Sequence, residues 1–293
     1  MVFHTKGRPV AVLGAGVLGV KIACVWLAGG FDVNVRDPNR DQLSAARQHI
    51  DKDVLSMARA LGTADRAPGK ATFIQDMKCA VQNAWLVIES VPEHLELKKS
   101  VFQELSNLVR SDCILGSNSS SFKSSLMLEN VDSLVRRRCL NIHYTMPPEI
   151  RAVELMTSTY TEESVFTTLM EIHTYIGLKP VVAKSESTGI ILGRLWAAVK
   201  REALSILSED ICTPQDLDSI WLEMFLGNNR GPCRMMDAVG LDTVKLIEEN
   251  YISERNLDRS KTVDFLEENY ISQGKLGLKS QAGGFYETRD VST

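Results

Sequence analysis

Residues 10–19 read VAVLGAGVLG, an apolar run that passes into a glycine-rich turn, and this stretch decides the fold. The first four residues predict a buried strand, and residues 17–28 predict a helix after the turn. Between such elements the first glycine permits the tight bend, the second lets the backbone approach a pyrophosphate, and the third lets helix and strand pack closely. The pyrophosphate would meet free amides at the helix start. The residues expected to contact a dinucleotide are Gly14, Gly16, Val17, Leu18 and Gly19.

An acidic residue follows the second apolar strand. Residues 31–36 predict that strand, and Asp37 comes directly after it, at about the 20-residue distance that a dinucleotide-binding unit requires. A carboxylate there holds the ribose 2′-hydroxyl and repels a 2′-phosphate, so NAD is expected in preference to NADP, with Arg36 acting against that preference. A glycine-rich turn without a ligand is the alternative interpretation. The complete strand, turn, helix and acid argue against it.

Strands and helices alternate through the first part of the chain. Strands are expected at 9–13, 31–36, 84–90, 113–117 and 139–142, and helices at 17–28, 42–61 and 95–109. Such alternation predicts a mainly parallel sheet with helices on both faces. From Gly189 onward helical periodicity takes over. The predicted fold class is α/β, with an N-terminal Rossmann-type doubly wound sheet (residues 1–184) followed by a smaller all-α C-terminal domain (residues 185–293).

The helical part carries a start signal and a weak repeat. Thr213 and Pro214 predict a helix start, with Thr as the N-cap and Pro in the first turn. Two tail segments are similar, LIEENYIS at 246–253 and FLEENYIS at 265–272. We interpret them as two similar helix ends in preference to a duplicated unit, because one repeat pair is too little for a solenoid.

Composition excludes several classes of protein. The 293 residues are 44% hydrophobic and 24% charged with a net charge of −4, which favours a folded globular protein and argues against general nucleic-acid binding. No apolar run reaches the roughly 18 residues of a membrane span, and no signal or transit segment is recognised, so a cytoplasmic protein is expected. The six cysteines form no CxxC pair, so neither a metal site nor a disulfide framework is expected.

One histidine stands out by its position. His143 ends the strand RCLNIH and precedes a proline-containing turn, and ligands in such folds sit beyond the carboxyl ends of strands. Glu154 lies downstream in the apolar segment AVELM, where a buried carboxylate needs a partner. A His143–Glu154 pair would satisfy it and raise the basicity of the imidazole. A structural histidine and a glutamate that faces water are the alternatives.

A serine-rich segment, SNSSS at 117–121, follows another predicted strand. Hydroxyls at a strand end can hydrogen-bond a substrate oxygen. On spacing alone, a serine-rich turn or helix cap is an equally simple interpretation. The sequence contains no GxSxG motif, so a hydrolase is not supported.

These motifs together resemble the L-3-hydroxyacyl-CoA dehydrogenases and their relatives that act on free hydroxy acids, such as L-gulonate 3-dehydrogenase. The resemblance covers nearly the whole chain. The matching segments are GAGVLG with Asp37, SVPEHLELK at 90–98, SNSSS at 117–121, the histidine–proline turn with its downstream Glu, TGIILGR at 188–194, RGPCRMMDAVGLDT at 230–243 and KLGLKSQAGGFYE at 275–287.

The resemblance implies roles for particular residues. It implies that Ser120 binds substrate and cofactor, that His143 is the catalytic acid and base, and that Glu154 orients it. It places the family's cofactor contacts on Glu93 and Lys98. It further implies hydride transfer to or from NAD, a 3-hydroxy acid or its thioester as substrate, a role in fatty acid metabolism, and a homodimer formed through the C-terminal domain.

Several features depart from the family's pattern. Gly193 occupies the place of an asparagine that binds the substrate oxygen, and loss of such a donor can cost ~10²–10³ in rate. Met146 replaces an asparagine that contacts the cofactor. The spacing from His143 to Glu154 is one residue shorter, and the helical hairpin that holds coenzyme A is shortened. Two alternatives therefore stay open: a biosynthetic reductase acting on a non-CoA carbonyl or imine, and a cofactor-binding protein without catalytic activity.

Overall fold

The computed structural model describes residue 5 and residues 7–225 and 231–287. The chain divides into two compact units after Ile190, a few residues beyond the boundary expected after residue 184. Within the described residues, no helix combines the length and apolar character needed to cross a membrane.

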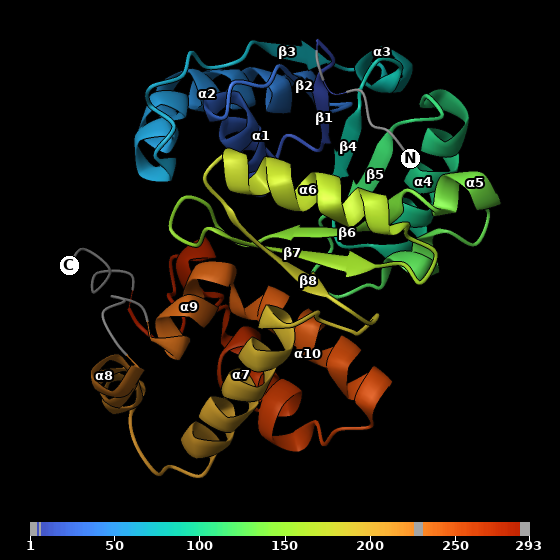
Figure 1. Cartoon of the computed structure of the whole chain (residues 1–293). Coiled ribbons are helices and arrows are strands. Elements are labelled where there is room, and N and C mark those ends of the chain that lie inside the picture. The colour runs from blue at the N-terminus through green and yellow to red at the C-terminus, as the bar shows by residue number, and fades with distance from the viewer. Residues whose placement is uncertain (1–4, 6, 226–230, 288–293) are drawn as a thin grey trace. The chain divides into compact units, whose positions relative to one another are not determined.

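The first unit is built on one sheet of eight strands (Figure 1). The strands are β1 (Val10–Leu13), β2 (Val33–Arg36), β3 (Ala71–Ile74), β4 (Leu86–Glu89), β5 (Ile114–Ser117), β6 (Cys139–Tyr144), β7 (Ala152–Thr157) and β8 (Lys179–Ala183). Their order is β3-β2-β1-β4-β5-β6-β7-β8, parallel except for the antiparallel pair β6–β7. The order reverses between β1 and β4, and ligands of such sheets bind outside the carboxyl ends of the strands at this point.

Helices cover both faces of the sheet (Figure 1). One face packs against α1 (Val17–Ala28), α2 (Arg40–Leu61) and α6 (Glu163–Tyr175); the other packs against α3 (Met77–Val81), α4 (Leu95–Leu108), η1 (Ser124–Met127) and α5 (Ser133–Arg136). The central strands are buried on both sides, which explains why they read as continuous apolar runs.

The predicted fold class is confirmed, but three strands were not expected from the sequence. The predicted strands correspond to β1, β2, β4, β5 and β6, whereas β3, β7 and β8 were missed. β3 is short and only partly buried. β8 contains Pro180 but lies at the edge of the sheet, where the missing amide is tolerated. In β7, the charged side chain of Glu154 interrupts the apolar pattern. Its burial is possible because its partner, His143, lies opposite it on the neighbouring strand β6.

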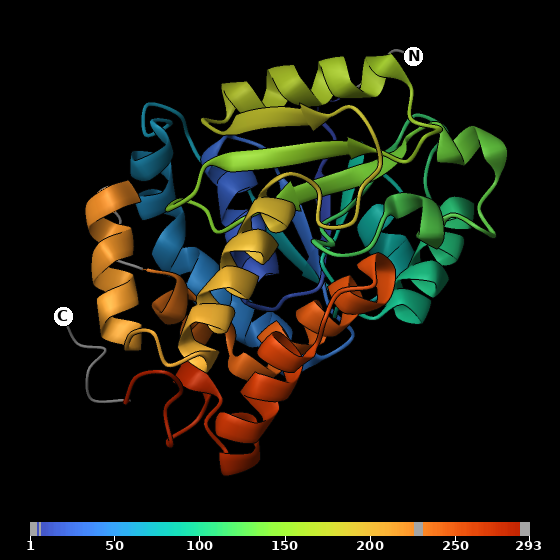
Figure 2. The same ribbon diagram turned by 90° about the horizontal axis from the view of Figure 1, so that it is seen from below.

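The described residues of the second unit are helices and connecting loops, seen as the gold, orange and red segments of Figure 2. They comprise α7 (Leu192–Ser208), α8 (Pro214–Phe225), α9 (Pro232–Val239), α10 (Leu241–Arg255), the π-helical turn η2 (Ser260–Asp264), α11 (Phe265–Asn269), η3 (Ile271–Gln273) and η4 (Gly277–Lys279). The expected start of α8 is confirmed, since Thr213 Oγ1 accepts the Asp216 amide and Asp216 Oδ2 accepts the Thr213 amide in return. This is a capping box.

A buried ion pair joins α7 and α10. Lys200 Nζ lies 3.3 Å from Glu248 Oε1, and both side chains are almost completely excluded from solvent. Burial lowers the pKa of the Lys200 ammonium, and the Glu248 carboxylate acts against that shift. Removing either partner would leave an uncompensated buried charge, which is strongly destabilising.

A second buried polar group lies in the core of the first unit. Trp26 Nε1 donates to Tyr144 Oη at 3.0 Å, and Tyr144 Oη lies 2.7 Å from His173 Nε2. His173 Nδ1 lies 2.7 Å from the Leu169 carbonyl, which can only accept, so Nδ1 carries the proton and Nε2 accepts from Tyr144. The chain of donors is complete only while His173 is neutral, and burial lowers its pKa to about 4.

We expect this histidine to make folding sensitive to acid. In the unfolded chain its pKa is the ordinary 6.5, so between pH 6.5 and 4 the unfolded state binds the proton and the native state does not. The free energy of unfolding therefore falls through that window as the pH falls, by up to about 3 kcal/mol. Urea titrations of wild type and His173→Gln at several pH values measure this. Equal losses of stability in both proteins would contradict the assignment.

Candidate active site

The glycine-rich turn between β1 and α1 has three differently constrained positions. Gly14 has φ of +103°, and a Cβ there would lie 2.4 Å from the Ser90 carbonyl oxygen. A Cβ on Gly19 would lie 1.9 Å from the Gly14 carbonyl oxygen. A Cβ on Gly16 would meet nothing within 4 Å. The protein itself therefore requires glycine at 14 and 19, whereas the space over Gly16 is left open for a ligand.

The surroundings of this turn fit a dinucleotide. Gly16 is the N-cap of α1, no side chain caps the helix, and its first turn contains no acidic residue, so the helix N-terminus is suited to a phosphate group. At the end of β2, Asp37 Oδ2 accepts the Ala15 amide and Oδ1 accepts the Asn39 amide, each at 2.9 Å. The expected ribose-binding carboxylate is thus hydrogen-bonded to the glycine-rich turn. Arg36 donates its Nε to the Gln75 carbonyl.

The structure brings His143 and Glu154 together. They are directly opposite each other in the antiparallel pair β6–β7, and His143 Nδ1 lies 2.8 Å from Glu154 Oε2. Both side chains are buried. A carboxylate accepts the Nδ1 proton, which leaves Nε2 as the basic nitrogen of the ring. The arrangement can therefore move a proton at Nε2 while the carboxylate fixes the ring and stabilises its cation.

The chain around His143 is fixed by two asparagines. The Tyr144 amide donates to Asn118 Oδ1 at 2.8 Å, and Asn141 Nδ2 donates to the carbonyls of Ser119 and Phe122. These bonds join the end of β6 to the segment after β5. The carboxyl ends of both strands therefore form one rigid surface, as a site that positions reacting groups requires.

The expected substrate-binding serine lies on this surface. Ser120 is half-buried, and its side chain makes no hydrogen bond to the described part of the chain. Its neighbours are occupied: Ser119 Oγ donates to Glu93 Oε1, and the Ser121 amide reaches the same oxygen at 3.3 Å. Ser120 is also more exposed than Ser117, Ser119 and Ser121, which are buried, so its hydroxyl is accessible to a ligand.

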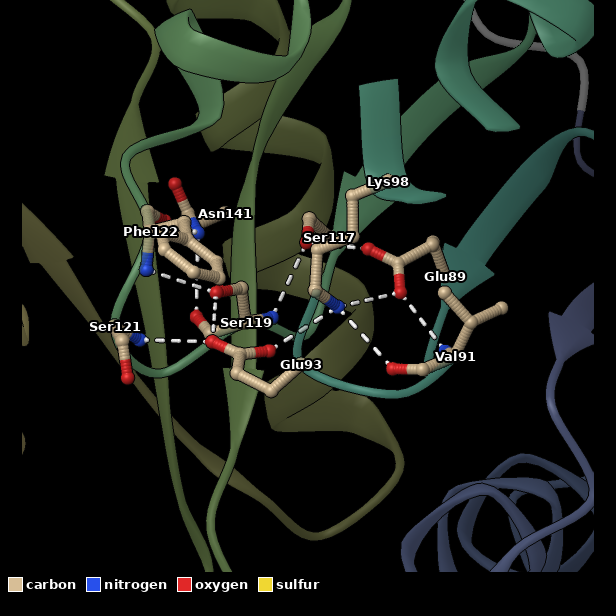
Figure 3. A network of polar contacts seen from close by, with 9 residues as sticks. All are labelled: Glu89, Val91, Glu93, Lys98, Ser117, Ser119, Ser121, Phe122 and Asn141. Carbon is tan, nitrogen blue, oxygen red and sulfur yellow. Dashed lines mark hydrogen bonds and ion pairs between the residues drawn. The ribbon is translucent and has the colours of Figure 1, made fainter. Parts of the chain in front are cut away.

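Figure 3 shows a network that the sequence indicated only in part. Lys98, expected at the cofactor site, is 1% exposed, and its Nζ lies 2.7 Å from Glu89 Oε1 and 3.2 Å from Glu93 Oε2. Glu89 was not expected in the site, and Ser117 was noted only as part of the serine-rich segment. Ser117 Oγ donates to Glu89 Oε2 at 2.6 Å. A carboxylate that ends the apolar strand LVIE was the available signal, since a charge there needs a buried partner.

Two further residues singled out from the sequence are Gly193 and Met146. Gly193 is in the first turn of α7, in the second unit. Met146 follows His143 after two residues and is 40% exposed. No group of three or more potential metal ligands occurs among the described residues.

Family models match nearly the whole chain. Residues 9–186 match the model described as "3-hydroxyacyl-CoA dehydrogenase, NAD binding domain", and residues 189–288 match the corresponding C-terminal domain. These two stretches contain every residue that is discussed above as part of the site.

Individual relatives agree with this match. The chain is 32% identical over 254 residues to a 3-hydroxybutyryl-CoA dehydrogenase of Mycobacterium tuberculosis, covering 84% of this chain and 86% of that protein. It is 49% identical over 151 residues to the 3-hydroxyacyl-CoA dehydrogenase-like protein LAM1 of Cochliobolus heterostrophus, covering 52% of this chain and 32% of that protein. A solved diketoreductase, described as acting on dicarbonyl compounds, superposes with a TM-score of 0.79 at 31% identity, covering 96% of this chain and 99% of that one.

Proposed function

Because the chain belongs to the 3-hydroxyacyl-CoA dehydrogenase family, we propose that this NAD-dependent oxidoreductase interconverts a 3-hydroxy acid, or its coenzyme A thioester, and the 3-oxo form. The observation that carries the proposal is the buried His143–Glu154 pair at the carboxyl end of β6. A histidine held by a carboxylate on Nδ1 is the arrangement required for proton transfer at Nε2.

In the oxidation direction, His143 Nε2 takes the proton of the substrate hydroxyl as the carbon gives up its hydride, and Glu154 stabilises the resulting imidazolium. In the reduction direction, the same nitrogen returns the proton to the oxygen. Bound NAD supplies the hydride acceptor, and NADH supplies the donor. The proposed cofactor-binding residues are the glycine-rich turn (Gly14, Gly16, Val17, Leu18 and Gly19), Asp37, Glu93 and Lys98, with Ser120 binding both cofactor and substrate.

The experiment that tests the proposal is nicotinamide fluorescence of the purified protein with NADH, followed by acetoacetyl-CoA. Cofactor binding followed by NADH oxidation is the expected result. Binding of NADH without turnover of acetoacetyl-CoA would overturn the thioester substrate and direct the search to other carbonyl compounds. Failure to bind NADH would overturn the function itself.

A second candidate function is reduction of a bulky ketone that carries no coenzyme A. Exposed apolar side chains, Met146 and Ile150, flank the turn after His143. Lys21 of α1 contacts Glu149 of the same turn at 3.1 Å, so this turn lies beside α1, the helix that follows the glycine-rich turn. An apolar rim there favours a substrate with an apolar body. Turnover of a bulky diketone but not of acetoacetyl-CoA would select this candidate.

The family resemblance implies that an asparagine at position 193 binds the substrate oxygen, so we expect Gly193→Asn to raise kcat/KM for acetoacetyl-CoA by about tenfold. Gly193 lies within α7, where Asn is tolerated at least as well as Gly. Steady-state rates of both proteins with acetoacetyl-CoA measure the effect. A variant that binds NADH normally and gains no activity would show that the site lacks more than this donor.

The proposed quaternary state is a homodimer formed through the second unit. Apolar side chains of that unit are exposed, including Leu195, Ile211, Ile220 and Leu246, each more than 60%. In α8, Leu217 and Trp221 are partly buried, and the side chains of Met224 and Phe225 lie outside the described part. Light scattering after size exclusion tests the dimer. We further propose a cytoplasmic location, which fractionation of the cells tests.

A further inference from the structure

Three charged side chains form a compact group beyond the carboxyl ends of β4 and β5 (Figure 3). Glu89 and Lys98 are buried, whereas the Glu93 side chain is 38% exposed. The Lys98 ammonium contacts both carboxylates, at 2.7 Å and 3.2 Å. Two carboxylates therefore share a single ammonium, which leaves a formal charge of −1 on this cluster of Glu89, Glu93 and Lys98.

All four carboxylate oxygens of the cluster act as hydrogen-bond or ion-pair acceptors. Glu89 Oε1 accepts Lys98 and the Val91 amide, and Oε2 accepts the Ser117 hydroxyl. Glu93 Oε2 faces Lys98, and its Oε1 accepts the Ser119 hydroxyl and the Ser121 amide. A protonated carboxyl would put a donor on one of these oxygens. The arrangement thus suits two ionised carboxylates.

The N-terminus of α4 offsets part of this charge. Glu93 lies two residues before the first residue of the helix, Leu95, and a helix N-terminus is equivalent to roughly half a positive charge. That half charge is smaller than the unbalanced unit charge of the cluster. The cluster and the helix terminus together therefore contribute a negative electrostatic potential at the ends of β4 and β5.

The strand order places the cluster between the two ends of the proposed reaction site. The order β1-β4-β5-β6 sets the glycine-rich turn after β1 on one side and His143 of β6 on the other. The turn also lies against the end of β4, since the Ser90 carbonyl packs so closely on Gly14 that a Cβ there would clash with it. A dinucleotide bound at the turn must extend past β4 and β5 to bring its reacting ring to His143.

We propose that the Glu89–Glu93–Lys98 cluster raises the affinity of the site for NAD⁺ relative to NADH. The inference rests on the proposed function. The nicotinamide ring is cationic when oxidised and neutral when reduced, so a fixed negative charge beside it stabilises the oxidised form selectively. Hydrogen bonds to the ribose or pyrophosphate affect both forms alike and leave the ratio of the two affinities unchanged.

The test is the ratio of the dissociation constants of NAD⁺ and NADH, measured by calorimetry or by fluorescence without substrate. Glu93→Gln keeps the shape of the side chain and brings the formal charge of the cluster to zero. We expect it to raise the Kd of NAD⁺ relative to that of NADH by about three- to tenfold, a modest value because Glu93 is partly exposed and its field is screened.

Two matched variants separate charge from other effects. Glu96→Gln removes the same charge from an exposed position in the first turn of α4, and Ser119→Ala removes a hydrogen bond to Glu93 without changing charge. Both should leave the ratio unchanged. An unchanged ratio in Glu93→Gln, or an equal change in either control, would overturn the inference. A wild-type protein that binds neither form would instead overturn the proposed function.

Discussion

His143→Gln lowers kcat by about 10³-fold, within the 10²–10⁴ range of general acid–base catalysis, while the affinity for NADH stays within about twofold of wild type. Glutamine fits the space but cannot take up the hydroxyl proton. It also replaces the ring that Glu154 holds at 2.8 Å. Initial rates with the best substrate, together with NADH titrations, measure both quantities.

Two further variants serve as a control and as an intermediate case for this prediction. His49→Gln changes an exposed histidine on α2 and should retain full activity. Glu154→Gln should keep a fraction of the activity, because His143 remains but loses the carboxylate that stabilises its cation; we expect a loss of about 10²-fold. If His143→Gln retained more than a tenth of the wild-type kcat, the assigned acid and base would be wrong.

Gly16→Ala is expected to weaken cofactor binding strongly without destabilising the fold. The backbone of Gly16, with φ of −72° and ψ of −177°, suits alanine, and its Cβ would meet nothing within 4 Å. The methyl group would instead occupy the space over which a pyrophosphate approaches the helix amides. Loss of about two charge-assisted hydrogen bonds corresponds to a rise of at least ~100-fold in the Kd of NADH.

Gly19→Ala provides the contrasting variant. Its Cβ would lie 1.9 Å from a backbone oxygen, so the helix and turn must separate, at a cost of about 1–3 kcal/mol in unfolding free energy. Thermal melts and NADH titrations of both variants distinguish the two roles. A Gly16→Ala protein that bound NADH as tightly as wild type would show that the cofactor does not approach this glycine.

Much of the first unit could be predicted because its signals are local. The central strands β1, β4 and β5 are buried on both faces, so each is a short apolar run. The glycine-rich turn needs neighbours only a few residues away. β7 and β8 were missed because their place depends on pairing with strands distant in the sequence, and a charge in one and a proline in the other obscure the apolar pattern.

The site residues likewise fall into those that the sequence indicated and those that only the fold brought together. His143 could be selected from its position at a strand end, and Glu154 from the cost of burying a carboxylate alone. Their alignment in the β6–β7 register is what places the two side chains 2.8 Å apart. Glu89 carried a signal, a carboxylate at the end of an apolar strand, and Ser117 lay in the serine-rich segment, but their pairing could not be predicted because it depends on the sheet bringing the ends of β4 and β5 together.

The sequence by itself determined the dinucleotide-binding turn, the α/β class and the helical second part, because short-range periodicity and backbone sterics specify them. The tertiary structure decided the conformation of segments whose sequences are nearly the same. The segment at 246–253 continues through α10, whereas the nearly identical segment at 265–272 leaves α11 at Asn269 and enters the 3₁₀ turn η3. The buried charges of Glu89, Lys98 and Glu154 likewise acquire their partners only in the folded chain, because those partners come from other strands and helices.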